Sequence, residues 1–224
     1  MSPVSRPDVS RRDALVLAGL LGAGGAALLT LRATRPVGEP IPLSPTLEAV
    51  QAEQRPGWGP AGADLHLLLF TDYNCGACRR AHPEMTAAVV ADGGVAIRSF
   101  DWPIFGDDSR AAARGALAAD AQGLYRPVHE ALMPGGRADG AAAEAALTAA
   151  GGSVARLRET LATEGERIDG MLARNAFHAF SLGLGGTPGH VIGRLLLRGA
   201  VSEREFRRAF DRARKLTESG TLKG

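Results

Sequence analysis

The sequence of 224 residues contains only two cysteines, Cys75 and Cys78, and two residues separate them. A structural zinc site normally needs four ligands. Cys75, Cys78 and His82 supply three, and no second cluster of Cys or His lies nearby in the sequence. A disulfide between the cysteines would close almost no chain, so it would add little stability. The shortage of cysteine leaves a single pair whose chemistry has to be explained.

Excess charge and repeats are also missing. The formal net charge is +2, the arginines are spread over several segments, and no basic run carries interleaved aromatic residues. This pattern is unlike that of nucleic-acid-binding proteins, so we expect no nucleic-acid partner. The chain contains no internal repeat and no heptad pattern. Its 45% apolar and 22% charged residues are typical of a globular protein of one domain, with or without an insertion.

The N-terminus has the pattern of an export signal. Arg11 and Arg12 precede an uncharged apolar run at residues 14–31, which is a basic region followed by a hydrophobic region. Ser10-Arg11-Arg12 also resembles a twin-arginine signal. No Ala-x-Ala cleavage site follows, so residues 1–34 are either an export signal or a membrane anchor. Both alternatives place the rest of the chain in the periplasm or another extracytoplasmic, oxidising compartment.

The segment after the N-terminus predicts a β-α-β unit. Residues 35–62 read as a Pro-rich linker and N-terminal extension with a short helix at 46–54. The near-continuous apolar run at 65–71 predicts a central strand. A helix then starts at the cysteines and runs to about residue 90, with Asn74 as the expected N-cap. A second strand is expected at 95–104.

The rest of the chain predicts helices and then a return to β structure. Residues 106–184 have apolar residues at helical spacing throughout. Two short apolar segments flank Gly193-Arg194 and predict a hairpin. Ser202 and Glu205 form a capping box that opens a last helix. The sequence therefore predicts an α/β, thioredoxin-like fold. Its core comprises residues 63–105 and 185–219, and an all-helical insertion occupies 106–184.

Four interpretations of the Cys-x-x-Cys pair compete. A c-type haem requires histidine directly after the second cysteine, but Arg79 stands there. Structural zinc and a structural disulfide are disfavoured for the reasons above. The remaining interpretation is a redox dithiol at the start of a helix that follows a strand. At that position the free N–H groups and the helix dipole stabilise an anionic sulfur.

The positions of the two cysteines predict their roles. Cys75, in the first turn, is the expected nucleophile, and the small Gly76 and Ala77 should leave it accessible. Cys78, one turn further and more buried, is the expected resolving thiol. His82 falls on the same helical face as Cys78, where it would tune that thiol or carry a proton. The alternative is that His82 is simply an exposed helix residue.

The stretches "FTDYNCGACRRAHPEM" and "GGTPGHVIG" resemble the DsbA family of extracytoplasmic thiol:disulfide oxidoreductases, from about residue 43 to the C-terminus. The resemblance implies that Pro188 follows a cis peptide bond and packs against the disulfide. It also implies that the backbone of Thr187 contacts the substrate chain.

Two departures from the family pattern concern proton transfer and redox potential. Many relatives carry a buried glutamate six residues before the nucleophile, where this chain has Leu69. Proton transfer must then use water, Asp72 or another group. The dipeptide between the cysteines is Gly76-Ala77 instead of the usual proline-containing pair, and this leaves the oxidising strength open.

We therefore expect an enzyme that exchanges disulfides with exported client proteins through Cys75 and Cys78. It would need no bound cofactor or metal, would be reset by a membrane redox partner, and would be a monomer. Two alternatives remain. The dithiol could hold Cu(I), a soft ion that suits thiolates, or the enzyme could act as a reductase or isomerase instead of an oxidase.

Overall fold

The computed structural model describes residues 36–221, with side chains to residue 218, and a few helical positions nearer the N-terminus: Arg12, Val16, Leu17, Gly19, Leu20, Gly22, Gly24 and Gly25. The chain forms two compact units, Met1–Pro36 and Val37–Gly224. Because only eight positions before residue 36 are described, most of the expected export signal or anchor, including Arg11, lies outside the described residues. Among the positions that are described, no helix is both long and apolar enough to cross a membrane.

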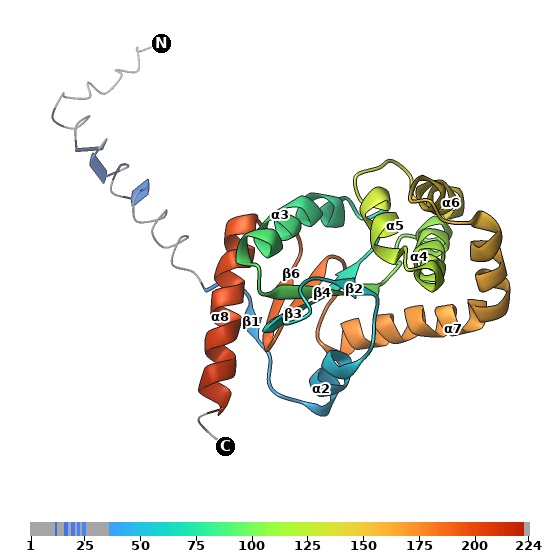
Figure 1. Ribbon diagram of the computed structural model, residues 1–224. Coiled ribbons are helices and arrows are strands. Elements are labelled where there is room, and N and C mark those ends of the chain that lie inside the picture. Colours follow the sequence, from blue (N-terminus) through green and yellow to red (C-terminus); the bar gives the residue numbers. More distant parts are fainter. Residues whose placement is uncertain are drawn as a thin grey trace, which may run out of the picture. The chain divides into compact units, whose positions relative to one another are not determined.

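A six-stranded sheet forms the centre of the second unit (Figure 1), with the order β1-β6-β5-β3-β4-β2. Strands β3 and β4 are parallel, and the other neighbouring pairs are antiparallel. The strands are β1 (Glu39–Pro40), β2 (Gly57–Trp58), β3 (Leu65–Thr71), β4 (Val95–Asp101), β5 (Gly189–Ile192) and β6 (Leu195–Arg198). The edge position of β1 accommodates Pro40, which has no N–H to donate to a neighbour.

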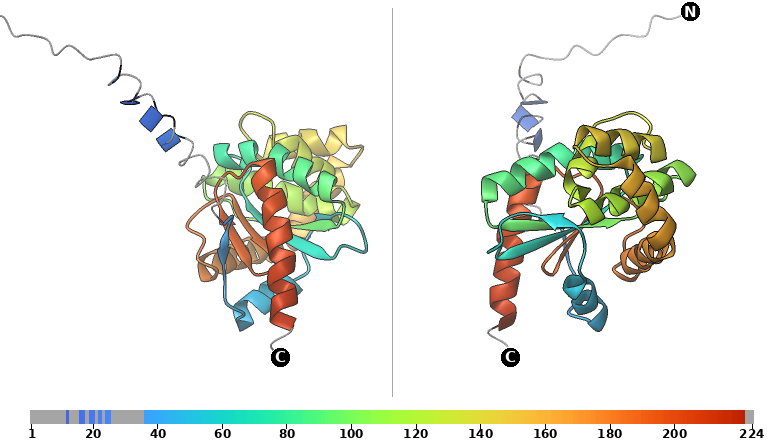
Figure 2. Two further views of the ribbon diagram at one scale, coloured as in Figure 1. Left: turned by 90° about the vertical axis from the view of Figure 1, so that its left-hand side faces the viewer. Right: turned by 45° about the vertical axis from the view of Figure 1, so that its right-hand side comes forward.

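Helices cover both faces of the sheet (Figures 1 and 2). The helices are α2 (Pro45–Ala52), α3 (Gly76–Asp92), α4 (Asp107–Ala119), α5 (Tyr125–Leu132), α6 (Gly140–Ala149), α7 (Val154–Ser181) and α8 (Glu203–Thr221), with a short 3-10 turn at Asp120–Gln122. Helices α3 and α8 pack on one face, α2 and the end of α7 pack on the other, and α4 to α6 stand beside the sheet. Helices α4 to α7 make up the helical insertion. They lie between β4 and β5 in the sequence and so interrupt the sheet-forming part of the chain.

Alternation along β3 separates the two faces of the sheet. Leu67 and Leu69 belong to the apolar cluster with α3 and α8, whereas Leu68 and Phe70 belong to the cluster with α2 and the end of α7. Successive side chains of a strand point to opposite faces. Because both faces are covered, the strand can be apolar at almost every position, which explains the continuous apolar run of the sequence.

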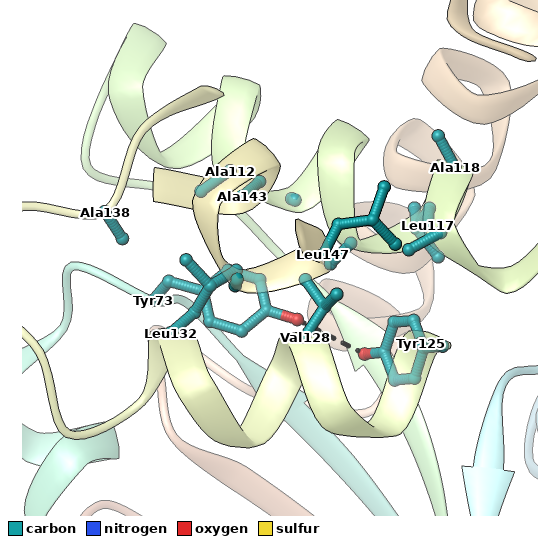
Figure 3. Packing of buried hydrophobic residues seen from close by; sticks show 14 of the residues in the cluster. Tyr73, Ala112, Leu117, Ala118, Tyr125, Val128, Leu132, Ala138, Ala143 and Leu147 are labelled. Atoms are coloured by element: carbon teal, nitrogen blue, oxygen red, sulfur yellow. Dashed lines mark hydrogen bonds between the residues drawn. The ribbon is translucent and has the colours of Figure 1, made fainter. Parts of the chain in front are cut away.

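The helical insertion has a core of its own (Figure 3). Alanine dominates the buried face of α4, and leucine, valine and tyrosine of α5 and α6 fill the space opposite. Gly115 allows α4 and α6 to approach closely, because a Cβ at that position would lie 2.5 Å from the Cβ of Ala143. Tyr73, which follows β3, packs into the same cluster and joins the insertion to the sheet.

The structure confirms the strand at 65–71, the hairpin around Gly193-Arg194 and the capping box. The backbone N–H of Ser202 donates to Glu205, and the backbone N–H of Glu205 donates to the Ser202 hydroxyl. The expected strand at 95–104 is too long, because it ends at Asp101, shortly before Pro103. The N-cap prediction is also wrong: Cys75, not Asn74, caps α3. The domain boundaries at residues 34, 62, 105 and 184 stay predictions.

Candidate active site

Cys75 lies where β3 has ended and α3 begins. Its sulfur accepts a hydrogen bond from the backbone N–H of Cys78, with an N–S distance of 3.3 Å. Its thiol donates to the backbone carbonyl of Thr187 at 3.3 Å, and the Thr187–Pro188 peptide bond is cis, as expected. Only 3% of the Cys75 surface is exposed. The sequence predicted a more accessible sulfur, and the Thr187 loop accounts for the cover.

Cys78 lies one turn into α3 and is buried. Burial raises the pKa of its thiol to about 12, and the neighbouring Cys75 adds to the shift. The Asp72 backbone and the hydroxyls of Thr187 and Thr71 oppose it by favouring the thiolate. Desolvation prevails, as expected for a charge placed in apolar surroundings. At ordinary pH, Cys78 is therefore a thiol that must lose its proton before it can attack.

A narrow pocket lies behind Cys78, between α3 and the sheet. His82, Thr71, Pro188 and His190 line it, together with apolar side chains of β3, α3 and the segment after α5. The pocket holds about 190 Å³ of unfilled space, but no part of it is wide enough to admit a water molecule. Burial lowers the pKa of His82, and Glu130 partly opposes that effect. Of the predicted site residues, Cys78, His82 and Pro188 thus meet in one place.

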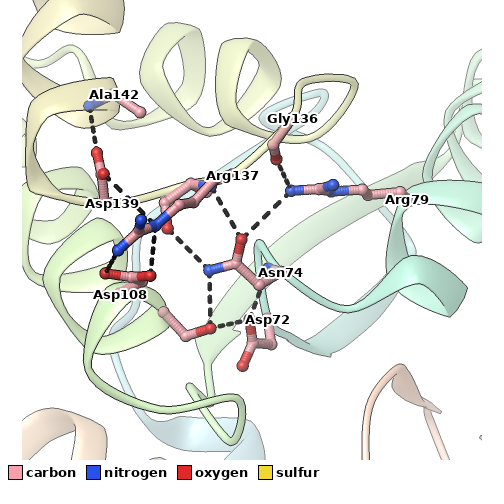
Figure 4. A network of polar contacts seen from close by, with 10 residues as sticks. Asp72, Asn74, Arg79, Asp108, Gly136, Arg137, Asp139 and Ala142 are labelled. Atoms are coloured by element: carbon pink, nitrogen blue, oxygen red, sulfur yellow. Dashed lines mark hydrogen bonds and ion pairs between the residues drawn. The ribbon is translucent and has the colours of Figure 1, made fainter.

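Asp72 lies apart from this pocket and has another set of partners (Figure 4). Its carboxylate accepts hydrogen bonds from the backbone N–H groups of Asn74, Ile104 and Phe105, at 2.7, 2.6 and 3.1 Å. The Ser109 hydroxyl donates a fourth, at 2.8 Å. The carboxylate therefore joins three segments: the Cys75 turn, the loop after β4 and the first turns of α4.

Asn74 and Arg79 attach the cysteine turn to the insertion. The Asn74 amide donates to Ser109 and to the carbonyl of Ala138, and its oxygen accepts from the Ala138 N–H. Arg79 donates to the carbonyls of Tyr73 and Gly136. These contacts explain why Asn74 is not the N-cap, because its side chain reaches across to residue 138. The Arg79 guanidinium is held by carbonyl oxygens and does not point at a sulfur atom.

A second buried polar group joins Asp101 to the insertion. The Tyr125 hydroxyl donates to both carboxylate oxygens of Asp101, at 3.1 and 2.9 Å. The Tyr73 hydroxyl lies 3.4 Å from that of Tyr125 and 3.0 Å from Nδ1 of His129. Burial raises the pKa of Asp101 to about 7, and hydrogen bonds from the tyrosines partly oppose the shift. Burial also lowers the pKa of His129 to about 3.

The sequence interpretation missed Thr71 and His190 as neighbours of Cys78. The alternation of side chains between the two faces of each strand contained this information. Thr71 follows Leu67 and Leu69 on one face of β3, and His190 is the cross-strand partner of Leu69. Within the described residues, no three His, Cys, Asp or Glu side chains are grouped as metal ligands would be.

The comparisons with known proteins agree with this arrangement. The family model of the DSBA-like thioredoxin domain matches residues 66–211, which include both cysteines and the Thr187–Pro188 bond. The chain belongs to the DsbA-like thioredoxin family. This family consists of thiol–disulfide oxidoreductases, so the predicted fold class and enzyme class are confirmed. No curated protein matches the chain significantly.

Solved structures of similar proteins cover most of this DsbA-like chain. A thioredoxin-like oxidoreductase from Silicibacter pomeroyi DSS-3 is 35% identical with a TM-score of 0.67, over 71% of this chain and 92% of the other. A periplasmic thioredoxin-like protein from Salmonella enterica serovar Typhimurium is 26% identical with a TM-score of 0.67, over 77% and 98%. Proteus mirabilis ScsC, in a transitional conformation, is also 26% identical with a TM-score of 0.67, over 90% of each chain.

Proposed function

We propose that this DsbA-like protein exchanges disulfides with exported client proteins, with Cys75 as the nucleophile and Cys78 as the resolving thiol. The observation that carries the proposal is the asymmetry of the pair. Cys75 caps α3, where a backbone N–H is directed at its sulfur, and it lies against the Thr187 carbonyl. Cys78 faces the closed pocket and keeps its proton. Both sulfurs are almost fully buried, so the two cysteines differ in their surroundings and not in exposure: Cys75 lies at the helix start beside Thr187, and Cys78 lies in the pocket. This difference supports Cys75 as the nucleophile.

The exchange balances without a cofactor. A client thiolate attacks Sγ of Cys75 in the disulfide form, the Cys75–Cys78 bond breaks, and its electron pair moves to Sγ of Cys78. A second client thiolate then attacks the client sulfur of the mixed disulfide and releases Cys75. The client loses two electrons and the protein gains them. Because the pKa of Cys78 is about 12, this sulfur takes up a proton as it leaves, which balances a proton that the client thiols lose when they form thiolates.

Thr187 and Pro188 are proposed as the substrate-binding residues beside Cys75. The carbonyl of Thr187 is already 3.3 Å from the Cys75 sulfur, and an extended client segment next to it could add main-chain hydrogen bonds in the manner of an added strand. His82 is proposed as a group that tunes Cys78, because it lines the same pocket. For Asp72 the geometry favours a role in holding the Cys75 turn.

The location and the partners follow from the N-terminal pattern and the family. We propose an extracytoplasmic, periplasmic location for the part of the chain that follows the export segment. DsbA-like proteins act on exported substrates and are usually reset by a membrane partner. We propose the same for this protein, and we propose that it is a monomer. The direction of net electron flow, whether oxidation, reduction or isomerisation, depends on the potential of the Cys75–Cys78 couple.

Two matched cysteine variants test the assignment of roles. Cys75→Ser should abolish exchange with a model dithiol peptide. Cys78→Ser should instead accumulate a mixed disulfide through Cys75, detected by mass spectrometry of the intact protein. A Cys75→Ser variant that still exchanges at the wild-type rate, or a Cys78→Ser variant that is trapped through another residue, would show that the roles are wrongly assigned. Retention of Cu(I) by a wild-type protein that does not exchange would favour the copper-binding alternative.

A further inference from the structure

Arg80 is an exposed cation that lies beside the proposed nucleophile. It belongs to α3, close behind the turn that carries Cys75. Side chains on a helix lean toward its N-terminus, and Nη1 of Arg80 lies 3.6 Å from the position that a Cβ would take on Gly76. Gly76 directly follows Cys75, and its lack of a side chain leaves room for the guanidinium over the first turn of the helix.

The neighbours of Arg80 do not neutralise its charge. Residues four apart on a helix commonly form ion pairs, and Glu84 has this spacing from Arg80. The Glu84 carboxylate instead accepts the backbone N–H of Glu203 at the start of α8, at 2.8 Å. Within the part of the chain that the structure describes, the side chain of Arg80 forms no ion pair and no hydrogen bond.

The other arginines near the cysteine turn do have partners. Arg79 donates to backbone carbonyls on both sides of the turn (Figure 4). Arg137 is ion-paired with Asp108. The carboxylate of Asp72 is occupied by its own four hydrogen bonds. Of these three arginines, Arg80 is therefore the one whose guanidinium has no partner among the described residues and stays available to an incoming chain.

We propose that Arg80 is a specificity-determining residue that pairs with an acidic side chain of the client, close to the client cysteine that joins Cys75. This inference rests on the proposed exchange and deepens it. Disulfide-bonded residues have Cα atoms about 5.5 Å apart, and an extended chain advances about 3.3 Å per residue, so a carboxylate about two positions from the client cysteine comes within reach of Arg80. The planar guanidinium also suits a carboxylate, which it binds through two parallel hydrogen bonds.

Activated peptides test the pairing. Each peptide has a single cysteine, held as a mixed disulfide with pyridine-2-thiol, and carries Glu or Gln at the second position before that cysteine. When Cys75 of the reduced protein attacks the peptide sulfur, the bond to the pyridine sulfur breaks and the released pyridine-2-thione is followed by its absorbance. The ratio of the Glu rate constant to the Gln rate constant should be roughly 2- to 5-fold higher in wild type than in Arg80→Gln, the range of an exposed ion pair. Comparison of ratios cancels any effect of Glu on the peptide itself.

Two further variants separate local pairing from overall charge. Arg156→Gln removes the same charge from an exposed position in the first turn of α7 and should keep the wild-type ratio. Arg80→Lys keeps the charge and should retain most of the preference. Added salt should lower the wild-type ratio toward that of Arg80→Gln. An unchanged ratio in Arg80→Gln, or an equal fall in Arg156→Gln, would overturn the inference.

A binding measurement keeps this inference separate from the proposed exchange. If the wild type reacts with neither peptide, the proposed exchange fails. Fluorescence anisotropy of the same peptides with serine in place of cysteine then reports on Arg80. Tighter binding of the Glu peptide by wild type but not by Arg80→Gln supports the pairing, and the absence of this preference contradicts it. Binding to phosphatidylglycerol vesicles that depends on Arg80, without a preference between the peptides, would assign Arg80 to a lipid surface instead.

Discussion

On the side of the cysteine turn that faces the helical insertion, the carboxylate of Asp72 accepts four hydrogen bonds. On the side that faces the sheet, the Thr71 hydroxyl, Nδ1 of His82 and both nitrogens of His190 make no hydrogen bond of ordinary geometry within the described residues, and only weaker contacts join Thr71 to Cys78 and His190 to the backbone of Leu197. The first region therefore gains stability from its polar groups, whereas the second loses some. In the proposed exchange, the Cys78 sulfur on the second side takes up and loses a proton. The difference indicates that the insertion side holds the cysteine turn in place, and that the sheet side is adapted to chemistry at some cost in stability.

The largest expected effect comes from breaking the partnered side. Asp72→Ala removes the acceptor of four hydrogen bonds and leaves two backbone N–H groups of the loop after β4 without a partner. Hydrogen bonds to a charged group contribute about 1.5–3 kcal/mol each. Water can replace the carboxylate at the exposed residues Ile104 and Phe105, so we expect the loss of the four bonds to lower the free energy of unfolding by roughly 4–6 kcal/mol. Denaturant titration followed by circular dichroism measures it.

The control for Asp72→Ala is Asp108→Ala. Asp108 is also at the start of α4, but its ion pair with Arg137 is on the surface. Exposed ion pairs contribute little to stability, so this variant should unfold close to wild type. Equal losses in the two variants would contradict the role given to Asp72.

The next largest effect concerns pH. The pKa of Asp101 is about 7 in the folded protein and near 3.8 in the unfolded chain. As the pH rises, Asp101 therefore ionises in the unfolded chain at a lower pH than in the folded protein. Its protonated form contributes stability below about pH 4, and this contribution is lost as the pH rises to about 7. A shift of about three units corresponds to about 4 kcal/mol at most.

Asp101→Asn should remove this dependence. The neutral buried histidines, His129 and His190, act in the opposite direction, because unfolding allows them to gain protons below about pH 6.5. The test is therefore the difference between wild type and Asp101→Asn, measured at several pH values from 4 to 8. That difference should favour the variant progressively as the pH rises. A constant difference would show that Asp101 is already ionised at pH 4.

Tyr125→Phe, which removes a hydrogen-bond donor to the Asp101 carboxylate, should have a smaller effect on the free energy of unfolding. The Tyr125 hydroxyl is the donor to both oxygens of Asp101, and hydrogen bonds to a charged group contribute about 1.5–3 kcal/mol. We expect a loss of that size at pH 8, where Asp101 is ionised, and a smaller loss at pH 5. Thermal unfolding at the two pH values measures it. Tyr125→Phe in the Asp101→Asn background should lose its pH dependence, and persistence of the dependence would assign it to another group.

The two sides of the cysteine turn also differ in how well the sequence predicts them. The sheet side follows local patterns: the apolar run of β3, the hairpin around Gly193 and the capping box at Ser202 were all predicted close to their observed positions. The insertion side depends on contacts between distant residues. Asn74 meets Ala138, and Asp101 meets Tyr125, across 64 and 24 positions of the chain. No local pattern records these distances, so Asn74 was wrongly assigned as the N-cap.

The candidate site shows the same division. Cys75, Cys78 and the Thr187–Pro188 pair carry short motifs, and the structure brings them together. Thr71 and His190 carry no motif, and their place beside Cys78 depends on the pairing of β3 with β5. The sequence contains the alternation that decides which face each side chain takes, but it does not state which strands are neighbours.

The smallest effect comes from removing an unpartnered hydroxyl on the sheet side. Thr71→Val replaces, with a methyl group of similar size, a hydroxyl that makes no hydrogen bond of ordinary geometry among the described residues and acts on the thiolate form of Cys78. Because a buried hydroxyl without a partner is unfavourable, the variant should be as stable as wild type or more stable by about 0.5–1 kcal/mol. Ser109→Ala removes a hydroxyl on the partnered side, where it donates to Asp72 and accepts from Asn74, and should lose about 1–2 kcal/mol. Denaturant unfolding of both variants shows whether each one gains or loses free energy of unfolding relative to wild type. If Thr71→Val is destabilised as much as Ser109→Ala, the hydroxyl of Thr71 has a partner in solution, and the two sides of the turn do not differ in the way proposed.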